Sequence, residues 1–222
     1  SVNHYKDQTD IFFTCHEFSY NKIAEAYEPY LGLIRQMFHK YCSGTLEEFM
    51  EECDVYKLQR PVFESYFEKG FCERTEQILI DEVEYEQERM HSSIVTMLQK
   101  LSEICPIVIV LNRFQLASKS TMQLTNRLLQ TKNKNIGIVL GVNDVQSIPE
   151  FAHEEWDAIC ESMDDRNMVY HIGNAGRNME PDVMDYYSDY ESDDGYRKLN
   201  NLVYFLDFDQ ADHHLSKIER RI

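Results

Sequence analysis

The fold class follows from two segments of the chain, PIVIVLNRFQLASKSTMQLTNRLLQ at residues 106–130 and NIGIVLGVND at residues 135–144. Each stretch opens with a run of β-branched and aliphatic residues, which is typical of a parallel strand buried on both faces. Between the two runs, residues 119–131 carry apolar side chains at helical spacing. This order of strand, helix and strand predicts an α/β domain with a mainly parallel sheet.

The same alternation continues on both sides of this unit. Short apolar runs bounded by polar residues predict strands at 11–15, 107–111, 136–140 and 168–171. Helical periodicity predicts helices within 21–42 and 73–103 and at 46–53, 61–69, 119–131 and 149–163. The predicted fold is therefore α/β, with a mainly parallel sheet, helices on both faces and a C-terminal helical segment.

Three local signals fix helix boundaries. Thr45 followed by Glu48 is a capping-box pattern that opens a short helix. Pro29 lies inside an apolar helical pattern and should start or kink the main helix there. Gly70 should end the helix that precedes it.

Composition limits the classes of partner. The 222 residues include 22 Lys and Arg against 39 Asp and Glu, so the formal net charge is 22 − 39 = −17. Duplex DNA and anionic membranes attract basic surfaces, so this balance argues against both. No apolar run reaches the roughly 18–20 residues of a membrane span, and the first residues lack the pattern of a secretory signal. We therefore expect a cytoplasmic protein that binds neither nucleic acid nor membranes.

The cysteines and histidines do not predict a metal or nucleophilic site. The chain has 6 cysteines and no C-x-x-C pair, which predicts reduced, buried thiols rather than a zinc site or disulfide frame. Cys15 and His16 are neighbours on a predicted strand, so their side chains point to opposite faces, and Cys15 is expected to be buried. His213 and His214 are adjacent on a predicted helix, about 100° apart, which does not suit metal ligation.

The pattern changes after the predicted α/β domain, which spans residues 1–175. Residues 176–198 are dense in acids, tyrosines and serines, which predicts a surface loop, with a docking or phosphorylation segment as the functional alternative. Residues 199–222 regain helical periodicity and are interpreted as the start of a C-terminal helical unit, with the natural protein continuing beyond it. The side chains expected to pack on the α/β body or a second chain are Phe205, Phe208, Leu215 and Ile218.

Polar residues follow the strand predicted at 107–111, where α/β proteins bind ligands. Asn112 and Arg113 come directly after the apolar run, and Asn143 and Asp144 follow the next strand along the chain. In P-loop ATPases with an additional strand, the strand equivalent to 107–111 ends in one or two acids. The first holds the magnesium shell and the second polarises the attacking water.

These residues carry a resemblance to a known family. Residues 10–145, roughly two thirds of the chain, resemble the nucleotide-binding domain of STAND-class signalling ATPases, particularly bacterial regulators in which this module precedes helical repeats. DIFFTCHEF at 10–18 resembles the strand after the P-loop helix, and Glu28-Pro29-Tyr30 resembles the helix that follows. Residues 111–121 match the frame of the Walker B segment, where Gln115 fits a Gln/His position and Thr121 a Ser position.

The chemical positions depart from that family. Asn112 and Arg113 replace the two acids, Ser118 replaces a later Asp, and Asn143 and Asp144 stand where the family has a polar or Arg sensor. The degenerate cofactor-binding positions implied by the resemblance are Asn112, Arg113, Gln115 and Asn143. An amide can join a magnesium shell through its oxygen, but it supplies neither negative charge nor a base.

The phosphate-binding loop of the family has no counterpart in the sequence. No G-x-x-x-x-G-K-[ST] occurs, and none of the 8 glycines is clustered before a Lys-Ser or Lys-Thr pair. Either the sequence begins after that loop or the protein has lost it, and in both cases we expect no hydrolysis and no bound cofactor. ATP with magnesium is expected only in a longer form. IGNAGRN, residues 172–178, is the one loop suited to approach a phosphate, with an ordinary turn as the alternative.

The resemblance therefore implies a non-hydrolysing STAND-like module that regulates a larger bacterial signalling protein. Its partners would be proteins or adjoining domains of the same polypeptide. One alternative is a fragment of an active ATPase whose P-loop lies upstream. Another is an α/β scaffold that forms homo-oligomers through its sheet edge or acidic helices. A Walker A motif upstream in the longer gene would favour the active ATPase. The molecular mass in solution would separate the homo-oligomeric scaffold from the other two hypotheses.

Overall fold

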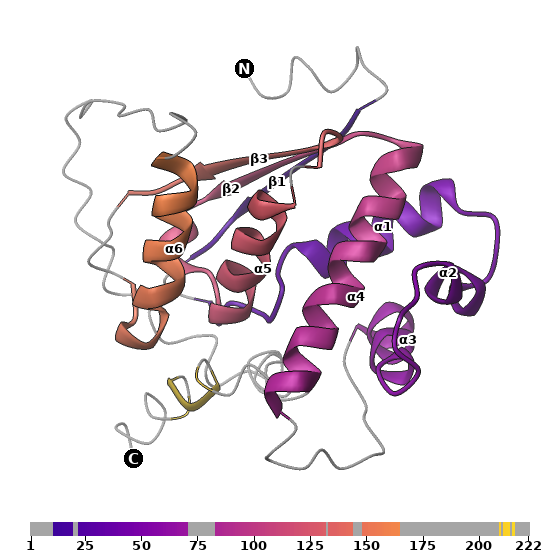
Figure 1. The fold of residues 1–222 in the computed structure, drawn as a ribbon, viewed down its shortest axis with the longest axis horizontal. Helices are drawn as coiled ribbons and strands as arrows, with labels where there is room; N and C mark the ends of the chain where they lie inside the picture. The colour runs from indigo at the N-terminus through magenta and orange to yellow at the C-terminus, as the bar shows by residue number, and fades with distance from the viewer. Residues whose placement is uncertain are drawn as a thin grey trace.

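A computed structural model describes residues 11–19, 22–70, 83–131, 133–143, 148–164, 209, 211–213 and 215. The strands are β1 (Phe12–Glu17), β2 (Ile107–Asn112) and β3 (Ile136–Gly141). The helices are α1 (Tyr30–Tyr41), α2 (Leu46–Glu52), α3 (Arg60–Lys69), α4 (Val83–Ile104), α5 (Lys119–Gln130) and α6 (His153–Asp164), with short 3-10 helices η3 (Phe114–Leu116) and η5 (Glu150–Ala152). Figure 1 shows their arrangement.

The strands form one parallel sheet in the order β1-β2-β3. Phe12 lies opposite Ile107, and Ile107 lies opposite Ile136, so the carboxyl ends of all three strands meet at one edge. The α/β class and the parallel sheet are confirmed. Each described strand runs one or two residues past its predicted end, and the strand predicted at 168–171 lies outside the described residues.

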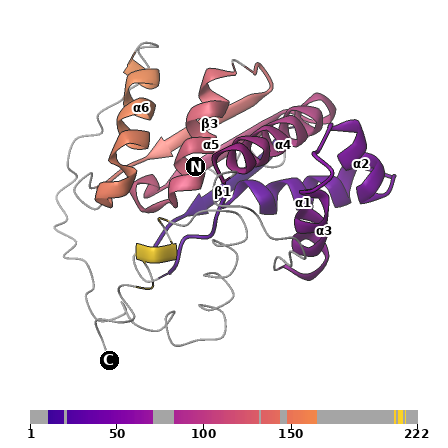
Figure 2. The same ribbon diagram turned by 60° about the horizontal axis from the view of Figure 1, so that its bottom comes forward.

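The sheet is covered unequally on its two faces. Ile107, Ile109 and Leu111 of β2 are fully buried, whereas Val108 and Val110 between them are only half-buried. On β3, Val139 is 53% exposed on the same face as Val108. Figures 1 and 2 show α4, α5 and α6 side by side over one face of the sheet. Within the described residues, the prediction of helices on both faces is thus met on one face only.

Hydrogen bonds between buried hydroxyls join α1 to α5. The Thr125 hydroxyl donates to the carbonyl of Thr121 at 2.7 Å and therefore accepts from the Tyr30 hydroxyl, also at 2.7 Å. Tyr30 is fully buried, and desolvation raises the pKa of its phenol. Because the buried polar groups satisfy each other, the helical layer is fixed over the sheet without leaving these hydroxyls unpaired.

The helix boundaries follow the sequence signals closely. Helix α1 starts directly after Pro29, so the proline begins this helix rather than kinking it. Gly70 ends α3 with φ of 77°, a conformation that favours glycine. Helix α6 starts four residues later than the predicted 149, because the residues after Pro149 first form the 3-10 turn η5.

The capping box at α2 is present in full. The Glu48 amide donates to the Thr45 hydroxyl at 3.2 Å, and the Thr45 amide donates to the Glu48 carboxylate at 2.8 Å. We expect Thr45→Ala to lower the free energy of unfolding by about 1 kcal/mol, because an amide at the helix start loses its acceptor. Urea denaturation measures this loss. Thr45→Ser, which keeps the hydroxyl, is the matched control, and an equal loss in both variants would contradict the capping role.

Part of the predicted C-terminal helical segment is described, and it lies beside the start of α5. Asp209 accepts from Lys119 at 2.6 Å, Ala211 is buried, and the ring of His213 lies edge-on to Phe151 with centroids 5.4 Å apart. Leu215 is 46% exposed, so it is not buried on the α/β body, and its packing against a second chain stays a prediction. The side of this segment that is buried carries Ala211. Phe205, Phe208 and Ile218 lie outside the described residues.

The cysteines among the described residues divide into buried and accessible ones. Cys53 and Cys105 are buried as predicted, whereas Cys42 and Cys160 are intermediate. The predicted burial of Cys15 is wrong, because Cys15 lies on the sheet face that the described helices leave uncovered.

Among the helices of the described ranges, none combines the length and apolar character needed to cross a membrane.

Candidate functional site

The candidate site is the edge where the three parallel strands end. Glu17 lies opposite Asn112, and Asn112 lies opposite Gly141. A Cβ atom on residue 141 would lie 2.9 Å from the Asn112 side-chain oxygen, so glycine at this position makes room for that amide. Asn112 is exposed, and its amide donates to the sulfur of Cys15 at 3.8 Å. The amide oxygen of Asn112 therefore lies at the edge of the sheet, against the backbone of β3.

Arg113 is held by a local backbone conformation and by one acidic neighbour. Its φ of 54° and ψ of 42° place it in the left-handed region, where the chain turns from β2 into η3. The Arg113 Nε lies 3.4 Å from the Glu17 carboxylate, and both side chains are substantially exposed. Such a pair contributes little to stability, about 0–1 kcal/mol, but it directs the guanidinium toward the end of β1.

Gln115 and Asn143 are brought together directly. Gln115 lies in η3 and is fully buried, and its side-chain oxygen accepts from the backbone N–H of Asn143 at 3.4 Å. Its side-chain nitrogen has no hydrogen-bond partner within the described part of the chain. The contact joins the turn after β2 to the turn after β3, so two of the four predicted positions are partners in one structural hydrogen bond. Asp144 lies outside the described residues.

Ser118 acts as the N-cap of α5. Its hydroxyl accepts from the Thr121 amide at 3.3 Å and lies 3.1 Å from the Glu25 carbonyl. The Ser120 hydroxyl, in turn, accepts from the Tyr27 amide at 3.3 Å. These contacts tie the segment after β1 to the start of α5, so the positions that match the Walker B frame serve here to join backbone segments.

His16 and Glu28 also belong to this edge, although the sequence patterns did not indicate them. The His16 Nε2 lies 3.4 Å from the Glu28 carboxylate. Burial and the neighbouring Lys22 lower the pKa of His16, while Glu25 and Glu17 act in the opposite direction. The position of His16 near the end of a predicted strand was the signal available. Its partner Glu28 lies in a turn before α1, which the helical periodicity of residues 21–42 does not distinguish from helix.

No protein-family model, curated protein or solved structure matches this chain. The carboxylates at the edge of the sheet have basic neighbours, Glu17 beside Arg113 and Glu28 beside His16. Within the described ranges, no group of three or more His, Cys, Asp or Glu side chains could hold a metal ion. The arrangement can accept and donate hydrogen bonds, but its described residues present no pair of carboxylates on neighbouring strand ends.

Proposed function

We propose that this chain is a non-hydrolysing regulatory module, a degenerate STAND-like ATPase domain that binds protein partners or adjoining domains of a larger signalling protein. The observation that carries the proposal is the use of the predicted nucleotide positions in internal contacts. The side-chain oxygen of Gln115 accepts from the backbone N–H of Asn143, and the guanidinium of Arg113 pairs with the carboxylate of Glu17. Side chains that join neighbouring strand ends stabilise the edge and are less available to a phosphate or a metal.

The sheet order supports the same proposal. In the family that the sequence resembles, the P-loop strand lies beside the strand equivalent to β3. Here β3 pairs with β2 on one side, and no described residue pairs with its other side. This edge of β3 is the one at which the resemblance implies a P-loop strand.

Among the departures from the family, the replacement of the magnesium-binding acid by Asn112 impairs hydrolysis most. Phosphoryl transfer needs a carboxylate-held magnesium and a group that orients the attacking water. The Asn112 amide supplies an oxygen without negative charge. The guanidinium of Arg113 next to it is always cationic, so it adds positive charge where the family has a second acid.

Nucleotide titration tests the proposal. We expect ATP with magnesium to bind this chain no more tightly than millimolar in calorimetry, because these 222 residues carry no phosphate-binding loop and Asn112 and Arg113 replace the magnesium-binding and water-polarising acids. Asn112→Asp alone should create no ATP hydrolysis. Micromolar binding to the 222-residue chain would overturn the proposal. Micromolar binding only in a longer natural form would favour the alternative of an active ATPase with an upstream P-loop.

A homo-oligomeric scaffold is the second candidate. It is favoured by Val139, which is 53% exposed on the sheet face that the described helices do not cover. β-Branched side chains on a sheet are normally buried against another layer. Light scattering of the purified chain distinguishes this candidate, which requires a dimer or larger assembly, from a module that is monomeric in the absence of its partner.

A further inference from the structure

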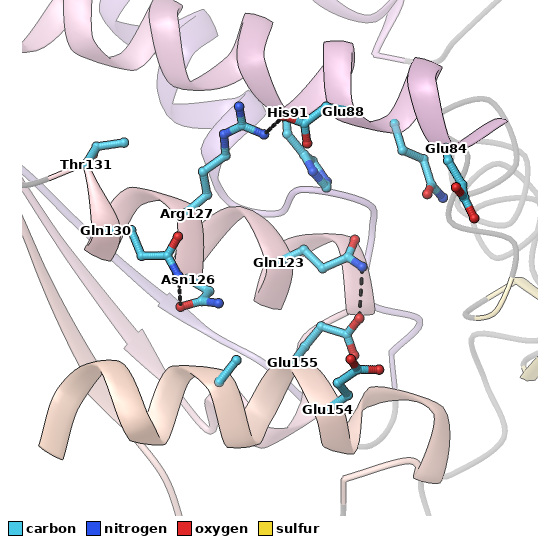
Figure 3. A pocket seen from close by; sticks show the side chains of 12 residues that line it. Glu84, Glu88, His91, Gln123, Asn126, Arg127, Gln130, Thr131, Glu154 and Glu155 are labelled. Carbon is cyan, nitrogen blue, oxygen red and sulfur yellow. Dashed lines mark hydrogen bonds and ion pairs between the residues drawn. The ribbon is translucent and has the colours of Figure 1, made fainter. Parts of the chain in front are cut away.

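A polar groove runs along the outer side of α5, between α4 and α6. Its volume is about 740 Å³. The floor is a strip of α5 side chains at helical spacing, and the walls come from the two flanking helices (Figure 3). The floor residues are Gln123, Asn126, Arg127 and Gln130. From Gln123 to Gln130 a helix rises about 10 Å, so the groove suits an extended ligand rather than a compact one.

Carboxylates dominate the charge of this groove. Glu84 and Glu88 line it from α4, and Glu154 and Glu155 line it from α6. Arg127 is the one Lys or Arg among the lining residues of this groove, and it is already paired with Glu88 at 2.5 Å. The second terminal nitrogen of Arg127 donates to the Ser92 hydroxyl at 2.9 Å. The remaining carboxylates give the groove a negative potential, which attracts cations and repels phosphates.

Glu155 offers an oxygen that is not engaged within the described residues. One carboxylate oxygen accepts from the Gln123 amide at 2.9 Å and lies 3.7 Å from the Lys119 ammonium. The other oxygen is buried and has no hydrogen-bond partner in the described part of the chain. A buried carboxylate oxygen without a donor is costly, because desolvation is not compensated. The Lys119 ammonium already lies beside this carboxylate, so the surroundings of Glu155 are compatible with an ammonium group.

His91 supplies the second such atom, from the opposite wall. The residue is 8% exposed, its ring lies edge-on to Tyr27 with centroids 5.4 Å apart, and Figure 3 shows it pointing from α4 into the groove. Its Nε2 has no hydrogen-bond partner among the described residues. Burial and the positive charge of Arg127 lower the pKa of His91 to about 4. The imidazole is therefore neutral near pH 7, and Nε2 can accept a hydrogen bond in the tautomer that carries the proton on Nδ1.

We propose that the groove between α4, α5 and α6 binds an alkylammonium ligand, whose N–H groups donate to Glu155 and His91 while Glu154 and Glu84 supply negative charge at the mouth. A free polyamine and the lysine side chain of a protein share this chemistry. A divalent metal is a poorer fit, because the described residues contain no group of three acidic, His or Cys side chains that could hold one. An anionic ligand would face the carboxylates of both walls.

Calorimetry at constant ionic strength tests the proposal. Two probes are titrated into the whole chain: spermidine, and lysine that is acetylated on its α-nitrogen and methylamidated at its carboxyl group, so that only its side-chain ammonium is charged. We expect saturable binding, with an affinity for spermidine that falls at least about tenfold in Glu155→Gln, because a charge-assisted hydrogen bond is lost. Glu154→Gln, at an exposed position, should weaken binding by a smaller factor without disturbing the fold. Tighter binding of spermidine than of the lysine probe assigns the groove to a free polyamine, and the reverse assigns it to a protein side chain.

Glu103→Gln is the matched control, since it removes the same charge from an exposed position of α4 that does not line the groove. It should leave the affinity for spermidine unchanged. Equal affinities in all three variants would mean that spermidine responds only to the overall charge of −17, and would overturn the proposal. His91→Phe should weaken binding while circular dichroism remains that of the wild type. Failure of both probes to bind the wild-type chain would also overturn it.

Discussion

Replacing Phe114 with alanine is expected to lower the free energy of unfolding by about 3–5 kcal/mol, the usual cost of deleting a buried aromatic ring. Phe114 is fully buried in η3, directly after the turn at Arg113. Its ring centroid lies 6.2 Å from that of Phe18 and 6.4 Å from that of Trp156. The ring thus joins the ends of β1 and β2 to α6, and a cavity there cannot be filled by any one of these elements moving alone.

Urea denaturation with a fluorescence readout from the one tryptophan measures this change. Phe114→Leu retains most of the buried volume and should cost less than about 1.5 kcal/mol. Leu58→Ala is a surface control, because Leu58 is 49% exposed. A loss in Phe114→Ala no larger than that in Leu58→Ala would mean that the turn after β2 is not packed as described.

The stability of the chain is expected to fall by about 2 kcal/mol between pH 7 and pH 5 through His91 alone. Burial, with Arg127 as the second cause, lowers the pKa of His91 from its ordinary 6.5 to about 4, and Glu88 opposes this shift. Between these two values the unfolded chain binds a proton that the folded chain does not. The stabilising contribution is therefore complete above about pH 6.5 and is lost as the pH falls toward 4.

His91→Phe should abolish this dependence, because phenylalanine keeps the aromatic contact with Tyr27 and does not titrate. The measurement is the difference in unfolding free energy between wild type and variant at pH 7 and at pH 5. Glutamates also titrate at low pH, but they contribute equally to both proteins and cancel in the difference. His39→Gln, at an exposed histidine, should change the same difference by no more than about 0.5 kcal/mol. Parallel profiles for wild type and His91→Phe would contradict the burial of a neutral imidazole.

Much of the fold was predictable because its signals are local. The β-branched runs of β2 and β3, the capping box at Thr45 and the stop at Gly70 depend on neighbours within a few residues. The exposure of Cys15 and Val139 was not predictable, since alternation along a strand distinguishes two faces but does not reveal which one is covered.

The candidate site was predictable only as positions, not as contacts. The edge holding Asn112, Arg113, Gln115 and Asn143 follows from parallel strands ending together. The bond between Gln115 and the Asn143 amide depends on the left-handed turn at Arg113, for which the sequence carries no glycine signal. The groove beside His91 was missed for a related reason. Periodicity predicts that a helix buries one stripe, but a groove depends on how far apart two neighbouring helices lie.

The register of the sheet has a consequence for how quickly the chain folds. Ile107 pairs with Ile136, which is 136 − 107 = 29 residues away, whereas Phe12 pairs with Ile107, which is 107 − 12 = 95 residues away. Closing the longer loop costs about 1 kcal/mol more chain entropy than closing the shorter one. Pairings so distant in sequence slow folding, because this entropy is lost before the contacts form. The unit of β2, α5 and β3 is therefore the part of the sheet best suited to nucleate first, and β1 joins a template that already exists.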